Sequence, residues 1–295
     1  MKKIILFSIL ISLLVSTGPI MPYAIWAAEE TAAVAKPPKK SPVTILIENL
    51  QSKDAAVSQN AREGLIKKGE KAVPKLIKAL SGADPYLKSE IIFILGNIQD
   101  KRAVPVLDEL TRDENAYIRR SAVEALTKIK DESVLNILSG SLLDLDSSVR
   151  ERAAKGLGEL GDQRETSSLI NRLQDEKEDL VRAAVISALG KLKDTNATGI
   201  LIEELNKEGI SPLCQAQVLS ALAQIKDQKS LPALNDYLAK LNASQPQEAV
   251  VKELKVEESG VEDVRAAMLK KMQAAELKEK IAQIEVIIKE IQEGP

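Results

Sequence analysis

The sequence of 295 residues contains no histidine, a single cysteine and only 2% aromatic residues. Without histidine there is no Ser-His-Asp triad, no Cys-His pair, and no metal site or pH switch built on imidazole. The cysteine, Cys214, lies in an apolar stretch, which favours a buried thiol over a nucleophile, and it excludes an internal disulfide. A net charge of −2 gives nucleic acid no electrostatic attraction to this chain.

The rest of the composition is that of an ordinary folded protein, with 44% apolar and 28% charged residues. The length allows one or two domains with a sizeable core. The sequence has no Gly-rich phosphate loop, no Cys-x-x-Cys pair and no nucleophile elbow. We therefore expect a protein that is not an enzyme and holds neither a cofactor nor a metal.

The N-terminus predicts export. Lys2 and Lys3 precede an apolar run from Ile4 to Val15, and no further charge occurs before Glu29. A short basic region followed by such a run is typical of a secretory signal peptide, here residues 1–28. The expected location is the bacterial periplasm or the medium.

An uncleaved membrane anchor is the alternative, because Ile4 to Ala28 is an uncharged stretch long enough to span a bilayer. Pro19 and Pro22 would interrupt such a helix, which favours cleavage after Ala27 or Ala28. The chain would contact a membrane only if this segment stayed uncleaved. Residues 29–42, rich in Pro, Lys and Ala, then form a solvated linker.

A repeat of about 31 residues organises the middle of the chain. One leucine recurs at spacings of 30, 31, 31, 32 and 33, at Leu65, Leu95, Leu126, Leu157, Leu189 and Leu222. Two more landmarks keep the same phase. The turn residues are Gly69, Asp100, Asp131, Asp162, Asp194 and Asp227, and the apolar-basic pairs are Leu87-Lys88, Ile118-Arg119, Val149-Arg150 and Val181-Arg182.

Each unit predicts two helices. The first follows the turn residue and often has proline in its opening turn (Pro74, Pro105, Pro232), where the missing N–H costs nothing. The second carries apolar residues at three- and four-residue steps, as from Ile118 to Ile129. One pair cannot bury its own apolar stripe, but stacked pairs share a core. The expected fold is all-α, an α-solenoid of about six repeats over residues 43–241.

These units resemble short HEAT repeats of the kind first named in phycobilin lyases. The matching text is DKRAVPVLDELTRDENAYIRRSAVEAL, and the resemblance is strongest over residues 100–192. It implies that the second helices line a concave binding surface. Deoxyhypusine hydroxylases resemble this fold too, but that family binds iron through His-Glu pairs, and this chain has no histidine. A lyase would need a tetrapyrrole site and a cytosolic target, which the export signal contradicts.

Repeated charges at the inter-helix turns predict a structural ladder. Its members are Asp113, Arg119, Asp144, Arg150, Asp175 and Arg182. A carboxylate at such a turn can cap the second helix or pair with an arginine of a neighbouring unit. A row of acid-base or anion sites is the alternative, but catalysis needs one differentiated site. The ladder is expected to lapse at Lys88 and at Cys214-Gln215.

The exposed side of the second helices is the candidate surface for a protein partner. Its predicted residues are Phe93, Arg120, Glu124, Lys128, Glu151, Lys155, Glu159 and Lys191. Their mixed signs favour a protein over nucleic acid. The same charges also fit a solvated face stabilised by pairs four residues apart, and both interpretations can hold together. Phe93 is either a contact anchor or covered by the N-terminal unit.

The C-terminal part departs from the repeat. A polar break with a short helix is expected over residues 242–260, followed by a long helix over 261–295. This helix carries an apolar seam at steps of 3, 4, 3, 4 and 3, formed by Ala274, Leu277, Ile281, Ile284, Ile288 and Ile291. The seam either pairs with a second copy, giving a homodimer, or folds back to cap the solenoid.

Together these features predict an exported, non-catalytic HEAT-repeat scaffold that binds a protein. The alternatives are an enzyme or enzyme-maturation factor of HEAT architecture and, if the N-terminal segment is uncleaved, a membrane-tethered assembly factor.

Overall fold

The computed structural model describes residues 40–244 and 261–294. The chain divides into two compact units, Met1–Ile45 and Leu46–Pro295. Of the first unit the structure describes residues 40–45, which include the start of helix α3 (Pro42–Asn49). The predicted signal peptide, nearly all of the linker and most of the predicted break with its short helix lie outside the described residues.

Within the described ranges the chain is all-α, as the sequence predicts. The helices that follow α3 alternate between second helices and first helices of successive repeats. The second helices, each of 14 residues, are α4 (Ala55–Lys68), α6 (Pro85–Ile98), α8 (Ala116–Ile129), α10 (Ser147–Leu160), α12 (Asp179–Leu192) and α14 (Pro212–Ile225). The first helices are α5 (Val73–Leu80), α7 (Val104–Leu110), α9 (Val134–Ser141), α11 (Thr166–Asp175), α13 (Thr198–Leu205) and α15 (Leu231–Ala243).

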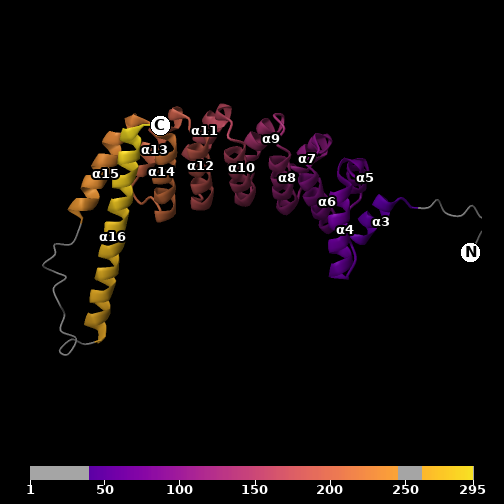
Figure 1. Cartoon of the computed structure of the whole chain (residues 1–295), viewed down its shortest axis with the longest axis horizontal. Helices are drawn as coiled ribbons and strands as arrows, with labels where there is room; N and C mark the ends of the chain where they lie inside the picture. The colour runs from indigo at the N-terminus through magenta and orange to yellow at the C-terminus, as the bar shows by residue number, and fades with distance from the viewer. Residues whose placement is uncertain (1–39, 245–260, 295) are drawn as a thin grey trace, which may run out of the picture. The chain divides into compact units, whose positions relative to one another are not determined.

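The unit from Leu46 onward stacks these pairs in one row. Second helices lie side by side along the inner side of the row and first helices along the outer side (Figure 1). All six aligned leucines are buried, with at most 1% of their surface exposed. Each pair therefore completes its core with the apolar stripe of its neighbours, and the predicted α-solenoid is confirmed.

The turns between repeats follow one design. A residue in the left-handed conformation ends the second helix, and an aspartate then caps a short 3-10 helix by accepting a hydrogen bond from the backbone N–H two residues on. At Lys193 the φ angle is 54°, and Asp194 Oδ1 accepts from Asn196 N at 3.0 Å at the start of the 3-10 helix Thr195–Ala197. Gly69 takes the place of these left-handed residues, four positions after its aligned leucine, and not the aspartate position expected from the sequence; its φ of 56° is positive like theirs, but its ψ is −138°. Glycine suits that position because it lacks the Cβ that opposes positive φ.

Small residues allow the second helices to approach closely. The residue after each aligned leucine faces the residue before the aligned leucine of the next repeat. A Cβ added to Gly158 would lie 2.8 Å from the Cα of Ala188. Between α8 and α10 the glycine lies instead before the aligned leucine, at Gly156, and the larger residue, Thr127, lies after the aligned leucine of the preceding repeat. A Cβ on Gly156 would lie 2.5 Å from Thr127 Oγ1. This packing fixes the distance between neighbouring second helices.

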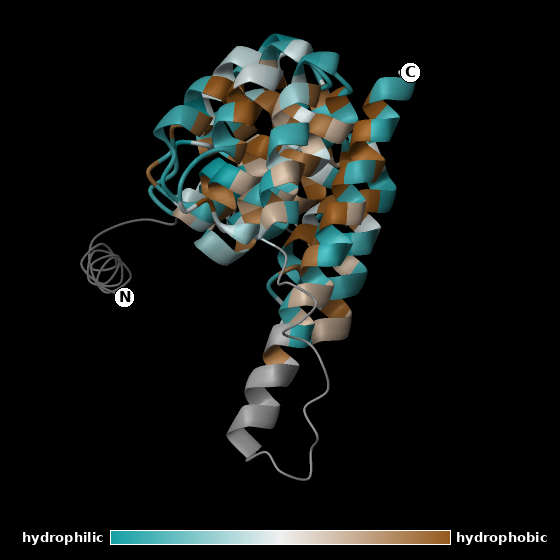
Figure 2. Cartoon of the chain, turned by 90° about the vertical axis from the view of Figure 1, so that its left-hand side faces the viewer, coloured by the Kyte–Doolittle hydropathy of each residue, from teal (hydrophilic) through white to brown (hydrophobic). Residues whose placement is uncertain are grey.

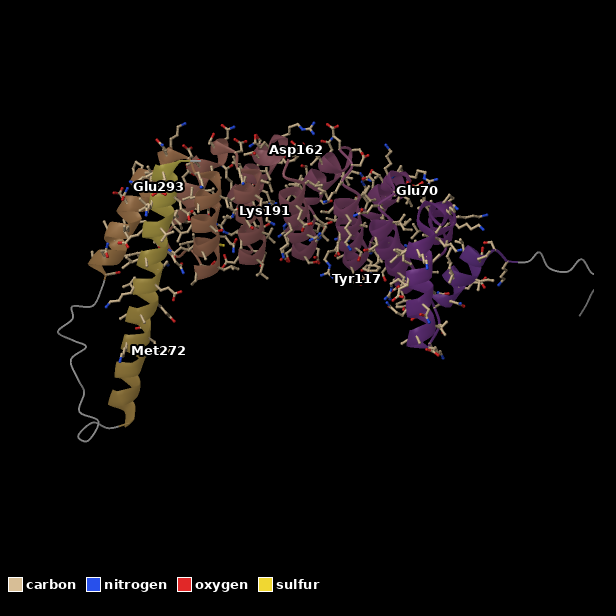
Figure 3. All side chains as sticks on the ribbon, in the orientation of Figure 1. Glu70, Tyr117, Asp162, Lys191, Met272 and Glu293 are labelled. Carbon is tan, nitrogen blue, oxygen red and sulfur yellow. The ribbon has the colours of Figure 1, made fainter. Side chains whose placement is uncertain are left out.

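The last helix, α16 (Val261–Glu293), completes the row. It packs against α15 and α14, and so takes the place of a second helix for α15. Ile281, Ile284, Ile288 and Ile291 of the seam are buried, with at most 7% of each exposed. Figure 2 shows α16 alongside the solenoid, and the stretch around Met272 extends beyond the ends of the neighbouring helices (Figure 3). Ala274 and Leu277 at the other end of the seam are half-buried. The isoleucine part of the seam is therefore buried within the chain, as the cap alternative predicts.

Candidate functional site

A ladder of ion pairs joins successive second helices and fixes the face that they present. Each cation reaches a carboxylate of the next repeat, which lies at the inter-helix turn in three pairs and in the last turn of α13, at Glu204, in the fourth. The pairs are Lys88–Asp113 (2.8 Å), Arg119–Asp144 (2.7 Å), Arg150–Glu176 (2.8 Å) and Arg182–Glu204. The two central arginines bind both carboxylate oxygens, with Arg119 Nε and Nη2 each 2.7 Å from Asp144.

The three arginines of the ladder and the carboxylates of Asp113, Asp144 and Glu176 also bind the backbone of their own turns. Arg150 Nη1 donates to the backbone carbonyl oxygens of Asp144 and Leu145 at 2.9 and 3.1 Å. Glu176 accepts from the backbone N–H groups of Lys177 and Glu178 at 3.0 and 3.1 Å. One arginine therefore locks two turns in adjacent repeats, which keeps the second helices in register.

Three carboxylates of the ladder, Asp113, Asp144 and Glu176, are held as anions by a lowered pKa. Burial alone would raise the pKa of Glu176, but the hydrogen bonds from Arg150 and from two backbone N–H groups outweigh it and lower the pKa to about 2. The pKa of Asp144 is lowered in the same way, with burial opposed by the hydrogen bonds from Arg119 and from Asp146 N. A carboxylate whose pKa lies far below neutral pH is a weak general base, and here its oxygens are occupied by the ion pairs that join neighbouring repeats.

The structure corrects the ladder in two places. Asp175 is the exposed last residue of α11 and takes no part, because that helix has 10 residues and the turn begins one residue later, at Glu176. The ladder also continues at Lys88, where a lapse was expected, since a lysine can reach the same carboxylate. At Cys214-Gln215 the arginine ladder does end, and Gln215 instead accepts a hydrogen bond from Lys280 of α16.

The exposed side of the second helices, here called the second-helix face, contains all eight residues predicted for partner binding, each at least partly exposed. Lys155 pairs with Glu151 at 2.5 Å, and Lys128 pairs with Glu124 at 3.4 Å, both four residues apart. The solvated charge pairs expected from the sequence are thus present on this face.

A hollow of about 290 Å³ opens on the second-helix face between α4, α6 and α8. Phe93, 44% exposed, lies in it with Arg62 and Lys128 against its ring, their charged groups 5.6 and 5.0 Å from the centroid. Arg120 stacks on Tyr117 at 5.4 Å on the same wall. Phe93 is therefore open to solvent on one side.

The sequence reasoning missed a row of exposed apolar side chains at the start of the second helices. Tyr86, Tyr117, Leu180 and Leu213 each lie nine residues before an aligned leucine, and are 42–64% exposed. Ser148 occupies the equivalent place in α10. The sequence could have predicted this row, because it lies three residues, about one helical turn, before predicted positions such as Arg120. Tyr117 of this row is labelled in Figure 3.

In the described part of the chain, no three Cys, Asp or Glu side chains converge as a metal site would require. None of the helices described there combines the length and the apolar character needed to cross a membrane.

The sequence matches the HEAT-repeat family over three overlapping ranges, residues 73–158, 141–209 and 166–255. The chain belongs to the HEAT-repeat family. No curated protein matches its sequence.

Several solved structures are similar in fold. The CpcE–CpcF complex of phycocyanin lyase from Nostoc sp. has 19% identity and a TM-score of 0.43, and the alignment covers 90% of this chain and 99% of the other. Human deoxyhypusine hydroxylase has 19% identity and a TM-score of 0.33, covering 81% and 96%. An engineered protein has 18% identity and a TM-score of 0.45, covering 84% and 77%.

Proposed function

We propose that this protein is an exported, non-catalytic scaffold that binds a protein partner through its second-helix face. The observation that carries the proposal is the hollow around Phe93. An exposed phenylalanine flanked by Arg62, Lys128 and a Tyr117–Arg120 stack brings together aromatic residues and arginines, which are enriched at protein interfaces. The partly exposed charges around it would form a polar rim.

The rigidity of the face supports the same role. The ladder and the close packing of the second helices hold the side chains of successive repeats at fixed spacings. A surface that is already ordered loses little conformational entropy when a partner binds, which improves affinity. The alternating charges favour a partner with mixed charges, and salt should weaken the attraction.

The non-catalytic part of the proposal is supported by the repetition of the charged groups. The same ion pair recurs from repeat to repeat, whereas an enzyme needs one site that differs from the others. The absence of histidine from the whole sequence removes the iron ligands of the hydroxylase family. Elemental analysis of the purified protein after chelator treatment should detect no stoichiometric iron or zinc, and one retained metal per chain would contradict this part.

Charge reversal on the face tests the binding role. The variant Glu124→Lys with Lys155→Glu changes two exposed ion pairs of α8 and α10 and leaves the net charge unchanged. It should impair affinity capture of the native partner without changing helix content. The matched control is Lys78→Glu with Glu109→Lys on first helices α5 and α7, where both residues are exposed. Equal effects of the two double variants would remove any special role for the second-helix face.

Arg172 on α11, the other obvious charge for such a control, is unsuitable because its Nε lies 3.3 Å from the buried carboxylate of Glu176. Its reversal would disturb the ladder and confuse loss of binding with loss of stability.

Export rests on the N-terminal sequence alone. Fractionation of the native cells and N-terminal sequencing test it, with the mature chain expected to begin at Ala28 or Glu29 in a soluble exported fraction. A chain that retains residue Lys2 and sediments with membranes would support the tethered assembly factor instead.

A further inference from the structure

The second-helix face ends in a second hollow, larger than the one at Phe93. It lies between α14 and α16 and measures about 810 Å³. Ala216 and Ser220 of α14 line it, and these residues lie six and two positions before the aligned Leu222, so the hollow is the C-terminal end of that face. The side chains of Pro212, Leu219, Val286 and Ile287 make its surface largely apolar.

The wall formed by α16 carries a regular stripe of its own. Six exposed residues follow at steps of 3, 4, 3, 4 and 3, on a side of the helix away from the buried seam: Leu269, Met272, Glu276, Glu279, Gln283 and Val286. The last four line the hollow, and Leu269 and Met272 continue the stripe beyond it. Such steps are the spacing that one helix presents to another packed alongside it. The stripe spans about 26 Å at ~1.5 Å per residue, the length of an 18-residue helix.

The order of chemistry along this stripe is apolar, acidic, apolar. Leu269 and Met272 are 56% and 61% exposed at one end, and Val286 is 54% exposed at the other. Between them lie Glu276 and Glu279, both exposed. Lys280 is the basic residue that lines the hollow, and its ammonium group donates to Gln215 across the groove.

We propose that this groove binds an amphipathic helix of a protein partner that carries basic residues at its centre and apolar residues towards both ends. The basic centre would face Glu276 and Glu279, and the apolar ends would cover Met272 and Val286. The inference rests on the proposed function, since it names the kind of partner that this end of the face accepts. A second copy of the chain fits poorly, because an α16 laid antiparallel on α16 would bring the acidic centres together.

Two synthetic peptides of 18 residues test the groove directly on the purified protein. Both carry leucines towards their ends on one face, and they differ only in having lysines or glutamates at the centre of that face. By fluorescence anisotropy the lysine peptide should bind saturably at one per chain, and the glutamate peptide about tenfold more weakly. Equal affinities, or no saturable binding of the lysine peptide, would overturn the proposal.

Two variants localise the binding. Glu276→Lys with Glu279→Lys should make the glutamate peptide bind more tightly than the lysine peptide. The matched control is Glu203→Lys with Glu208→Lys, at exposed positions on α13 and just after it, and it should leave the order of the two affinities unchanged. Ala216→Trp should fill the hollow and weaken the binding of both peptides, while the circular dichroism spectrum stays that of a folded helical protein. An unchanged order in the first variant, or a homodimer that Ala216→Trp dissociates, would refute a partner helix in the groove.

Failure of this inference is distinguishable from failure of the proposed function. If reversal of Glu124 and Lys155 abolishes native capture while reversal of Glu276 and Glu279 does not, the second-helix face stands and the groove is wrong. If the lysine peptide binds as described but the second-helix face proves dispensable, the groove stands and the broader proposal is wrong.

Discussion

Replacing Arg150 by alanine should destabilise the solenoid at its centre. Arg150 binds both carboxylate oxygens of Glu176 at 2.8 and 3.0 Å and donates to two backbone carbonyl oxygens of its own turn. Glu176 is only 2% exposed, so the variant leaves a carboxylate buried beside fewer partners.

The magnitude follows from what remains around Glu176. Breaking a fully buried pair by removing one partner costs about 3–5 kcal/mol. Glu176 keeps two backbone N–H donors and Arg172 at 3.3 Å, which offsets part of this. We therefore expect Arg150→Ala to lower the free energy of unfolding by about 2–3 kcal/mol, within the range for hydrogen bonds to buried charges.

Urea unfolding followed by circular dichroism at several pH values is the assay. The pKa of Glu176 is about 2 in the folded chain, below the ordinary value of 4.5, so this ion pair stabilises the protein above pH 4.5 and the contribution is lost as the pH falls towards 2. The difference between wild type and Arg150→Ala should therefore be full at pH 7 and shrink on acidification. Arg164→Ala, which removes an exposed arginine, is the control and should change little. An Arg150→Ala protein as stable as wild type at pH 7, or a difference that does not depend on pH, would refute the reasoning.

Three further predictions concern packing and backbone conformation. Gly156→Ala should cost about 1–3 kcal/mol, because the new Cβ meets Thr127 Oγ1, and Thr127→Ala should restore the loss; failure of the rescue would show that the two residues do not compete for the same space. Lys130→Gly should raise the free energy of unfolding by about 0.5–1 kcal/mol, because it relieves a left-handed conformation, and an unchanged urea midpoint would contradict this. Ile284→Ala should cost about 2–5 kcal/mol, whereas Val286→Ala on the exposed side of α16 should not; similar losses would mean that the seam is not buried.

Much of the fold could be predicted from the sequence because the repeat places the same physical demand on each unit. The aligned leucines, from Leu65 to Leu222, identify the core, and the aspartate turns identify where each pair begins. The seam isoleucines identify a buried stripe on the last helix. Periodicity alone, however, does not say whether α15 or a second chain buries that stripe, because both present an apolar surface.

Details set by single-residue shifts could not be predicted. Asp175 and Glu176 are adjacent carboxylates, and only the length of α11 decides which one reaches Arg150. The hollow at Phe93 is partly lined by Arg62 of the preceding repeat. Arg62 belongs to none of the repeated residue series, so the sequence did not indicate that it would lie beside Phe93. The groove beside α16 depends on how far that helix lies from α14, which no pattern within either helix encodes.

The most direct test of the central claim is site-specific photo-crosslinking in the native cells. Phe93 is replaced by a photoreactive phenylalanine analogue, which keeps an aromatic ring in the hollow, and the same analogue replaces Lys78 on the first helix α5 as the control. The account predicts a covalent adduct with one partner protein from position 93 and none from position 78. Adducts of equal yield at both positions, or none at position 93, would contradict a binding role for the second-helix face.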